Sequence, residues 1–297
     1  MAVSRPPNTP TTDRTVIEAP ARLEVLRARV AGWKRDGLRV ALVPTMGNLH
    51  AGHFSLVALA RQRADRVVAS VFVNPTQFGP GEDFGRYPRT PEQDAAGLEA
   101  AGCDLLWMPA VEAMYPFGVG DAVSIRVPGI TGVLDGAHRP GHFDGVATVV
   151  ARLFNQVQPD LAVFGRKDYQ QLAVIRHLVA DLAFPLEVVA ADTVRDRDGL
   201  ALSSRNQYLS PAERAVAPMI FRTLQAMRDQ ARAGGDFAAI EADAAATLAQ
   251  AGFEVDYAVI RGADLSMPGS APGTPLAALV AARLGRTRLI DNLEFIR

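Results

Sequence analysis

Two histidines stand three residues apart in the string L-H-A-G-H-F, at His50 and His53. If a helix begins at this point, that spacing turns both imidazoles toward the same side. The first turn of a helix exposes free N–H groups and the positive end of the helix dipole, which favour a phosphate. Gly52 removes a side chain between the rings, so a ligand can approach the backbone. The pattern therefore indicates chemistry on a phosphate-bearing ligand.

Two other interpretations of this histidine pair exist. The rings can be ordinary packed or solvated side chains, which a bare H-x-G-H does not exclude. They can also be a metal-binding pair, but no third ligand lies nearby in the sequence, and Cys103 is the only cysteine. We therefore discount a metal site at the histidines.

Neutral polar side chains occur in the string N-P-T-Q-F, which contains Asn74 and Gln77. Asn-Pro is a common turn starter, so ordinary turn chemistry accounts for Asn74 but leaves Gln77 unexplained. The string R-P-G-H-F adds Arg139 and His142, which can approach a ligand from the other side. These four residues are candidates for binding a small polar substrate.

A second candidate phosphate site is the string G-R-K-D-Y-Q-Q. Gly165 permits close approach of a ligand, and Lys167 supplies a point charge of the kind that binds phosphates. Asp168 can cap the following helix or help to hold Mg²⁺, and capping is the favoured interpretation. Gln171 falls one turn into that helix, on its loop-facing side.

The string L-S-S-R-N contains Ser203, Ser204 and Arg205. Two hydroxyls and a forked cation form a suitable cradle for a pyrophosphate leaving group. A serine-rich turn is the plainer interpretation, and for these three residues alone it is the better one.

The elements that must position these strings alternate between strands and helices. A strand before a glycine-containing loop and a helix places that loop at the carboxyl end of a parallel sheet, where ligands bind. Apolar runs predict strands at 40–43, 67–73, 104–108, 160–164 and 186–190, with 122–127 as a further candidate outside the parallel set. Helical patterns cover 24–36, 54–64, 91–101, 143–157 and 169–182. The pattern predicts a doubly wound, Rossmann-like α/β sheet.

The composition changes near residue 192. Two Ala-rich helical stretches, at 211–232 and 236–251, precede three candidate strands of a small antiparallel sheet, at 253–261, 276–283 and 287–292. We therefore expect a mobile tail at 1–20, an α/β domain at 21–192 and a smaller α+β domain at 193–297.

The composition also excludes some classes of protein. The chain has 297 residues, is 48% hydrophobic and has a formal net charge of −1, which describes a globular protein with no electrostatic case for binding nucleic acid. No apolar run approaches the roughly 18 residues of a membrane span, and the first 20 residues do not form a signal peptide. A single cysteine requires no oxidising compartment. We expect a cytoplasmic protein.

Taken together, the strings carry a resemblance. P-T-M-G-N-L-H-A-G-H resembles the H-x-G-H motif of the nucleotidylyltransferase superfamily, and the five strings occur in the order found in the pantothenate synthetases (pantoate–β-alanine ligases). The similarity covers residues 23–210 and extends more weakly to Asn292. One departure is Arg166, where that family usually has glutamate, which leaves the local charge open.

The resemblance implies an ATP-dependent condensation of pantoate with β-alanine through a pantoyl adenylate, with release of pyrophosphate and AMP. It implies that residues 21–192 bind ATP and pantoate, that residues 193–297 form a lid, and that the protein is a homodimer. It also implies Mg²⁺ bound with ATP, with Asp168 as a candidate ligand.

The resemblance also assigns residues to the site. It implies that His53, His50 and Lys167 are catalytic, and that Gln77, Gln171, Asn74, His142 and Arg139 bind pantoate or β-alanine. The implied ATP site consists of Met46, Gly47, His50, Gly52, His53, Gly165, Lys167, Asp168, Val194, Leu202, Ser203, Ser204 and Arg205.

Three competing functions remain open. A nucleotidyltransferase with a phosphate acceptor would need extra cations, whereas Gln77 and Gln171 are neutral. An aminoacyl-tRNA synthetase-like enzyme would need a tRNA surface, against which the net charge of −1 argues. A non-catalytic ATP-binding regulator would not release pyrophosphate in the presence of pantoate.

Overall fold

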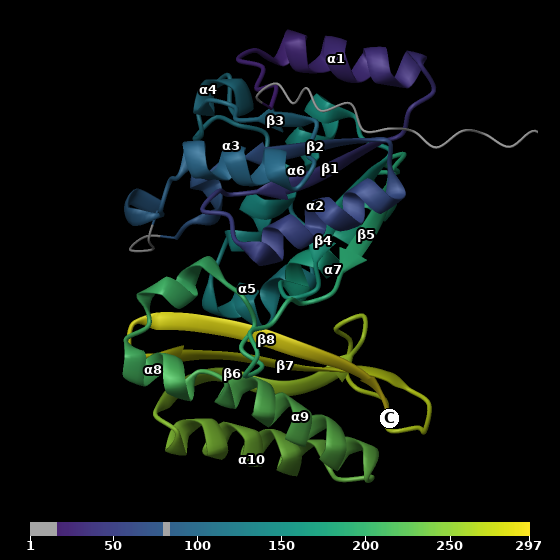
Figure 1. The fold of residues 1–297 in the computed structure, drawn as a ribbon. Helices are drawn as coiled ribbons and strands as arrows, with labels where there is room; N and C mark the ends of the chain where they lie inside the picture. The colour runs from purple at the N-terminus through teal and green to yellow at the C-terminus, as the bar shows by residue number, and fades with distance from the viewer. Residues whose placement is uncertain (1–16, 80–83) are drawn as a thin grey trace, which may run out of the picture.

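A computed structural model describes residues 17–79 and 84–297 of the chain (Figure 1). Its larger sheet has five strands in the order β3-β2-β1-β4-β5, and every pair of neighbours is parallel. The strands are β1 (Val40–Thr45), β2 (Arg66–Val71), β3 (Leu105–Trp107), β4 (Leu161–Gly165) and β5 (Glu187–Ala191). This arrangement confirms the predicted doubly wound α/β sheet.

Helices cover both faces of this sheet because its strands alternate two apolar faces. Val40 and Leu42 pack in one core with α1, α6 and α7, whereas Ala41 and Val43 pack in the other core with α2 and α3. The helices are α1 (Leu23–Arg35), α2 (Ala51–Arg63), α3 (Pro91–Ala100), α4 (Val111–Met114), α5 (Asp135–His138), α6 (His142–Val157) and α7 (Tyr169–Asp181). We call the sheet and these helices the N-terminal unit.

The strand order places a topological switch between β1 and β4, which are neighbours in the sheet. The chain leaves β1 toward β2 and β3 on one side, and leaves β4 toward β5 on the other. The loops that follow β1 and β4 therefore diverge and open a crevice at the carboxyl ends of the strands. The H-A-G-H string stands where the loop after β1 enters α2, and the G-R-K-D string leads from the end of β4 to the start of α7.

The C-terminal unit is a three-stranded antiparallel sheet with helices on one face (Figure 1). Its strands are β6 (Phe253–Gly262), β7 (Pro275–Leu284) and β8 (Thr287–Ile296), and its helices are α8 (Pro211–Val216), α9 (Met219–Arg232) and α10 (Phe237–Gln250). Leu276, Ala278 and Val280 of β7 pack in the core with α9 and α10. Ala277 and Leu279, which face the other way, pack with Leu134 and Tyr169 of the N-terminal unit.

Two expectations about the elements differ from the structure. Residues 122–127 do not form a strand, because the Ile125 N–H donates to the Thr148 hydroxyl (2.8 Å) rather than to a neighbouring strand. The helix predicted at 211–232 is two helices, α8 and α9, with Pro218 between them. A proline removes a backbone donor and so interrupts a helix.

The tail predicted at 1–20 falls mainly on residues 1–16, which lie outside the described residues. The last residues of the predicted tail do not belong to a mobile segment, because they contact the N-terminal unit: Ile17 is buried at 8% exposure, and Glu18 forms a parallel bridge with Leu105 of the edge strand β3. Among the helices in the described ranges, none is long and apolar enough to span a membrane.

Candidate active site

The two histidines form a reciprocal cap at the start of α2. His50 Nδ1 accepts a hydrogen bond from the Gly52 N–H (3.1 Å), and His53 Nδ1 accepts one from the His50 N–H (3.3 Å). A neutral imidazole that accepts at Nδ1 carries its proton on Nε2. Each ring can therefore donate an Nε2–H to a ligand at the helix N-terminus.

Both histidines are neutral at pH 7. Burial lowers the pKa of His53 to about 3, with His50 as a further cause. Burial also lowers the pKa of His50, helped by the positive charge of Lys167. Two neutral rings can lie with their centroids 4.2 Å apart without charge repulsion. The pair therefore offers hydrogen-bond donors, rather than imidazolium charges, to a phosphate.

Gly52, which leaves room for a ligand, also leaves room for the His50 ring in the histidine cap. A Cβ at this position would lie 2.9 Å from Cε1 and 3.0 Å from Nδ1 of the His50 ring. Any side chain would therefore displace the His50 ring from its position. The absence of a side chain at Gly52 is what allows the cap to form.

A buried carboxylate that the sequence did not single out holds the loop before the histidines. Asp94 of α3, 2% exposed, accepts hydrogen bonds from the backbone N–H groups of Asn48 (3.0 Å) and Leu49 (2.8 Å). Gly47, with φ +85°, lies against this carboxylate, where a Cβ would be 3.0 Å from Oδ2. The only sequence signal for Asp94 is the helix-start pattern T-P-E-Q-D. Gly47 was expected in the ATP site, but it lines neither cavity described below. Its position against Asp94 indicates that it shapes the loop instead of contacting a ligand.

Replacing Asp94 with alanine is expected to lower the free energy of unfolding by about 1–3 kcal/mol, because two buried N–H groups lose their acceptor. The histidine loop should then lose its fixed position, so pyrophosphate release should slow even in folded protein. Urea unfolding and a pyrophosphate-release assay measure the two effects. A folded variant with wild-type turnover would exclude a positioning role for Asp94.

The second loop, after β4, carries Lys167 and Asp168. The Lys167 side chain is 19% exposed, and its ammonium lies 3.6 Å from Asp168 Oδ1. Asp168 is the N-cap residue of α7, but its carboxylate accepts no hydrogen bond from the described backbone of that helix. The favoured capping role was therefore wrong, and the carboxylate instead lies beside the lysine.

Arg166, the departure from the family pattern, is neutralised by acids. Its Nη1 lies 2.5 Å from Glu294 Oε2, and its Nε lies 3.1 Å from Asp192 Oδ1. The local charge that the sequence left open is therefore balanced by residues on β8 and after β5.

Gln77 is placed by buried neighbours. Its side-chain oxygen accepts from Asn74 Nδ2 (3.1 Å), and its Nε2 donates to the sulfur of Met46 (2.9 Å). Asn74 is fully buried and also donates to the carbonyl of Gly145. Asn74 lines neither cavity described below, so the prediction that it binds substrate directly is corrected: it positions Gln77.

His142 also has a role different from the predicted one. Its Nδ1 donates to the carbonyl oxygen of Gln77 (2.7 Å), since a carbonyl can only accept, and its Nε2 accepts from Arg139 Nη1 (3.0 Å). Both ring nitrogens are thus engaged by the protein. His142 links Arg139 to the Gln77 segment instead of presenting a ring nitrogen to substrate.

The serine string begins a short 3-10 turn, Ser204–Tyr208. Ser203 caps it by accepting the Arg205 N–H (3.2 Å), which leaves the Ser203 hydroxyl proton able to donate elsewhere. Just before it, the Leu202 N–H donates to the Val194 carbonyl (2.9 Å), so these two residues lie side by side.

Two adjoining cavities collect these residues. The inner cavity, about 210 Å³, lies at the switch point between the two loops, and the outer cavity, about 730 Å³, lies between the two units. Both cavities are lined by Lys167, Asp168, Gln171, Ser203 and Arg205, so they adjoin at these five side chains. The other predicted residues in the inner lining are Met46, His50, Gly52, His53, Gln77, Gly165, Val194, Leu202 and Ser204.

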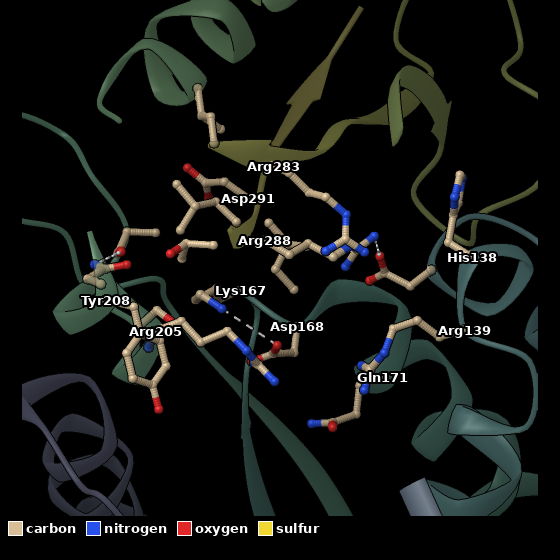
Figure 2. A pocket seen from close by; sticks show the side chains of 18 of the residues that line it. His138, Arg139, Lys167, Asp168, Gln171, Arg205, Tyr208, Arg283, Arg288 and Asp291 are labelled. Carbon is tan, nitrogen blue, oxygen red and sulfur yellow. Dashed lines mark hydrogen bonds and ion pairs between the residues drawn. The ribbon is translucent and has the colours of Figure 1, made fainter. Parts of the chain in front are cut away.

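The outer cavity is rich in positive charge. Figure 2 shows Lys167, Asp168, Gln171 and Arg205 on one side, with Arg283 and Arg288 of the C-terminal strands opposite. The predicted residues Arg139 and His142 also line it. Cations around a cavity of this size suit a ligand with several phosphates.

No group of three or more His, Cys, Asp or Glu side chains within residues 17–79 and 84–297 could hold a metal ion.

The switch-point crevice, the capped helix N-terminus and the lysine define an α/β enzyme that binds phosphate groups. The family model of the pantoate–β-alanine ligases matches residues 18–294. The chain belongs to this family, whose members condense pantoate with β-alanine at the expense of ATP.

Individual relatives cover nearly the whole chain. It is 65% identical over 280 residues to the pantothenate synthetase of Xanthomonas axonopodis pv. citri, covering 94% of this chain and 100% of that protein. It is 67% identical over 273 residues to that of Stenotrophomonas maltophilia strain K279a, covering 92% and 98%.

Solved structures agree with the fold. The pantothenate synthetase of Thermus thermophilus superimposes with a TM-score of 0.85 at 50% identity, covering 93% of this chain and 99% of that one. A pantoate–β-alanine ligase from Francisella tularensis, complexed with β-γ ATP and β-alanine, gives a TM-score of 0.77 at 29% identity, covering 93% and 97%.

Proposed function

We propose that the inner cavity performs the family's reaction in two steps. The carboxylate of pantoate attacks the α-phosphorus of ATP, and the bond to the pyrophosphate leaving group breaks. The amine of β-alanine then attacks the acyl carbon of pantoyl adenylate, and AMP leaves. The observation that carries this proposal is that two neutral imidazole donors and one ammonium line a single cavity.

The chemistry requires position and charge stabilisation rather than a nucleophilic side chain. We assign the Nε2–H groups of His50 and His53, with Lys167, to the negative charge that grows around the α-phosphorus. Ser203, Ser204 and Arg205 receive the departing pyrophosphate, on the side where the inner cavity adjoins the outer one. The remaining ATP contacts in this proposal are Met46, Gly52, Gly165, Val194 and Leu202.

Gln77 and Gln171 are proposed to bind pantoate. Both are neutral, and both line the inner cavity. Beyond its bonds with Asn74 and Met46, the Gln77 amide keeps one N–H and one acceptor lone pair for a substrate. Within the described part of the chain the Gln171 amide has no protein hydrogen-bond partner, so its donors and acceptor are available to a hydroxyl or a carboxylate. Arg139, on the outer side, is the candidate for the carboxylate of β-alanine.

Replacing Gln77 with alanine is expected to weaken pantoate binding far more than ATP binding, by about 1–3 kcal/mol, because substrate polar groups are left unpaired. Titration with each ligand measures this. Gln156→Ala is a matched control, since that buried glutamine bonds Trp107 and the Ala113 carbonyl outside both cavities. An equal loss for both ligands would contradict the assignment.

Mg²⁺ is proposed to enter with ATP. Asp168 fits this ion in part: its carboxylate lines both cavities and is not used as a helix cap. It would supply one oxygen, with phosphate oxygens and water completing the shell, and the ion would add positive charge at the phosphates. The 3.6 Å contact with Lys167 places the acid beside the phosphate-binding charge.

We propose that residues 21–192 are the domain that binds ATP and pantoate, and that residues 193–297 act as a lid. The support is that the outer cavity lies between the two units and is lined by both. We also propose a cytoplasmic location, which the use of ATP in biosynthesis favours.

A homodimer is proposed on the basis of exposed apolar side chains in one segment. Phe117 is 80% exposed and Val123 76% exposed, shortly after the edge strand β3. Exposed apolar residues that gather on one part of the surface mark interaction sites, and these two lie six positions apart in one segment. We expect light scattering of the purified protein to give the molar mass of a dimer of 31.8 kDa chains. Phe117→Asp should lower the measured mass toward that of the monomer. A monomeric wild-type protein would refute this proposal.

The whole proposal is tested with purified protein, ATP and pantoate labelled with ¹⁸O in its carboxylate. After addition of β-alanine, one labelled oxygen is expected in AMP, because the attacking carboxylate oxygen remains on phosphorus. Pyrophosphate release that does not require pantoate, or AMP without label, would refute adenylation of pantoate. No turnover at all would favour a non-catalytic ATP-binding regulator.

A further inference from the structure

Three side chains of β8 reach the N-terminal unit from one face of the strand. Arg288, Asn292 and Glu294 are separated by even numbers of residues, so they project the same way. Arg288 pairs with Asp135 of α5 at 2.5 Å. The other two contact the loop that carries Lys167.

Asn292 holds the backbone of that loop with both N–H groups of one amide. Its Nδ2 donates to the carbonyl oxygens of Arg166 and Lys167, each at 2.9 Å, and the residue is 5% exposed. Two buried hydrogen bonds to successive carbonyls fix the orientation of the peptide that leads into Lys167.

Glu294 holds the same loop through side chains. One carboxylate oxygen lies 2.5 Å from Arg166 Nη1, and the other lies 2.9 Å from the Tyr169 hydroxyl. Residues 166, 167 and 169 are therefore held by two side chains of β8, more than 120 positions away in the chain.

The Lys167 side chain has little local restraint of its own. Its ion pair with Asp168 is long, at 3.6 Å, and Asp168 does not cap α7 with its carboxylate. A four-carbon side chain has many rotamers, so the place of its ammonium depends strongly on the backbone that carries it. The Arg166 N–H bonds the Ala191 carbonyl at the end of β5 (2.8 Å), and the restraint on the two carbonyls that lead into Lys167 comes from β8.

We propose that Asn292 and Glu294 are positioning residues for the phosphate chemistry, through which the C-terminal unit sets the place of the Lys167 ammonium. This proposal rests on the proposed role of Lys167 at the phosphates. It makes the second unit part of the adenylation machinery. The pair Arg166–Glu294 also explains how this chain accommodates an arginine beside the reactive lysine.

The test uses two kinds of variant. Asn292→Asp keeps the size of the side chain but removes both N–H donors. The second kind exchanges the charges of residues 166 and 294. Arg166→Glu and Glu294→Arg alone should each raise the KM for ATP and slow adenylation by about 10–100-fold, since a misplaced group loses much of its effect. Asn292→Asp should do the same. The double variant Arg166→Glu/Glu294→Arg should recover part of the loss, because the ion pair is restored with opposite polarity while the contacts with Asp192 and the Tyr169 hydroxyl are not.

Two readouts separate positioning from general damage. Aminolysis of supplied pantoyl adenylate by β-alanine should stay near wild type in all these variants. The control is the same exchange at Arg63 and Glu187, an exposed ion pair of 2.7 Å between the end of α2 and the start of β5. These control variants should change the KM for ATP little.

A uniform fall in both half-reactions, or an unchanged KM for ATP in every single variant, would overturn the positioning proposal. An exchange variant no better than the single variants would overturn the role of the ion pair. The proposed function fails in a different way. If Lys167→Ala leaves adenylation intact, the role proposed for Lys167 at the phosphates is wrong, whatever the β8 variants do.

Discussion

Replacing His53 with alanine is expected to lower the rate of pantoyl adenylate formation by about 10²–10³-fold, the usual effect of removing one donor that stabilises transition-state charge. His53 is half-buried at the start of α2 and lines the inner cavity, and its Nδ1 accepts from the His50 N–H, so its Nε2–H is available to a ligand. Alanine removes this donor and half of the helix cap. Pantoate-dependent pyrophosphate release measures the effect.

The experiment on His53 includes a control variant at another histidine and a series of measurements at different pH. His177→Ala, at an exposed position of α7, should leave the rate unchanged. Because burial lowers the pKa of His53 to about 3, its neutral form predominates above that value, and wild-type activity should show no step from this group between pH 5 and 8. Near-normal turnover in a folded His53→Ala variant would remove the residue from the mechanism.

Lys167→Ala is expected to block the first half-reaction much more than the second. The ammonium is proposed to follow the phosphates while the α-phosphorus is attacked and pyrophosphate departs. Once pantoyl adenylate exists, pyrophosphate has left and most of that negative charge is gone. Aminolysis then depends mainly on holding the adenylate and β-alanine in line.

The experiment supplies pre-formed pantoyl adenylate with β-alanine and follows release of pantothenate. The variant should recover a large part of its activity relative to the reaction driven by ATP. Lys34→Ala is the control, because Lys34 is the only other lysine of the chain. It pairs with Asp160, just before β4, at the amino ends of the strands and away from the ligand-facing loops. If both reactions fall by the same factor, the phosphate-specific role of Lys167 is wrong.

The sequence predicted the elements whose order is local. The apolar runs at β1 and β4, each followed by a glycine-containing loop and a helical pattern, predicted both the sheet and the two ligand-facing loops. Periodicity and turn residues depend on neighbours within a few positions, so they can be read without the fold. His50, His53 and Lys167, which the structure brings to one cavity, were singled out for the same reason.

Errors arose where the chemistry of a side chain depends on partners elsewhere. Asn74 and His142 have residue types that suit a substrate site, but their polar atoms already bond Gln77, Gly145 and Arg139. Asp168 stands where a cap residue belongs, yet its carboxylate lies beside Lys167. A sequence shows which donors and acceptors exist, but not which of them the fold has already used.

By itself, therefore, the sequence determined the strand–loop–helix units, the two loops for which we propose phosphate chemistry, and the resemblance to one family. Only the tertiary structure decided what holds those loops in place. Asp94 reaches the Asn48 amide across 46 positions, and Asn292 reaches the carbonyl of Lys167 across 125. Such contacts depend on how the sheet, α3 and β8 pack together, and a local pattern contains no information about that packing.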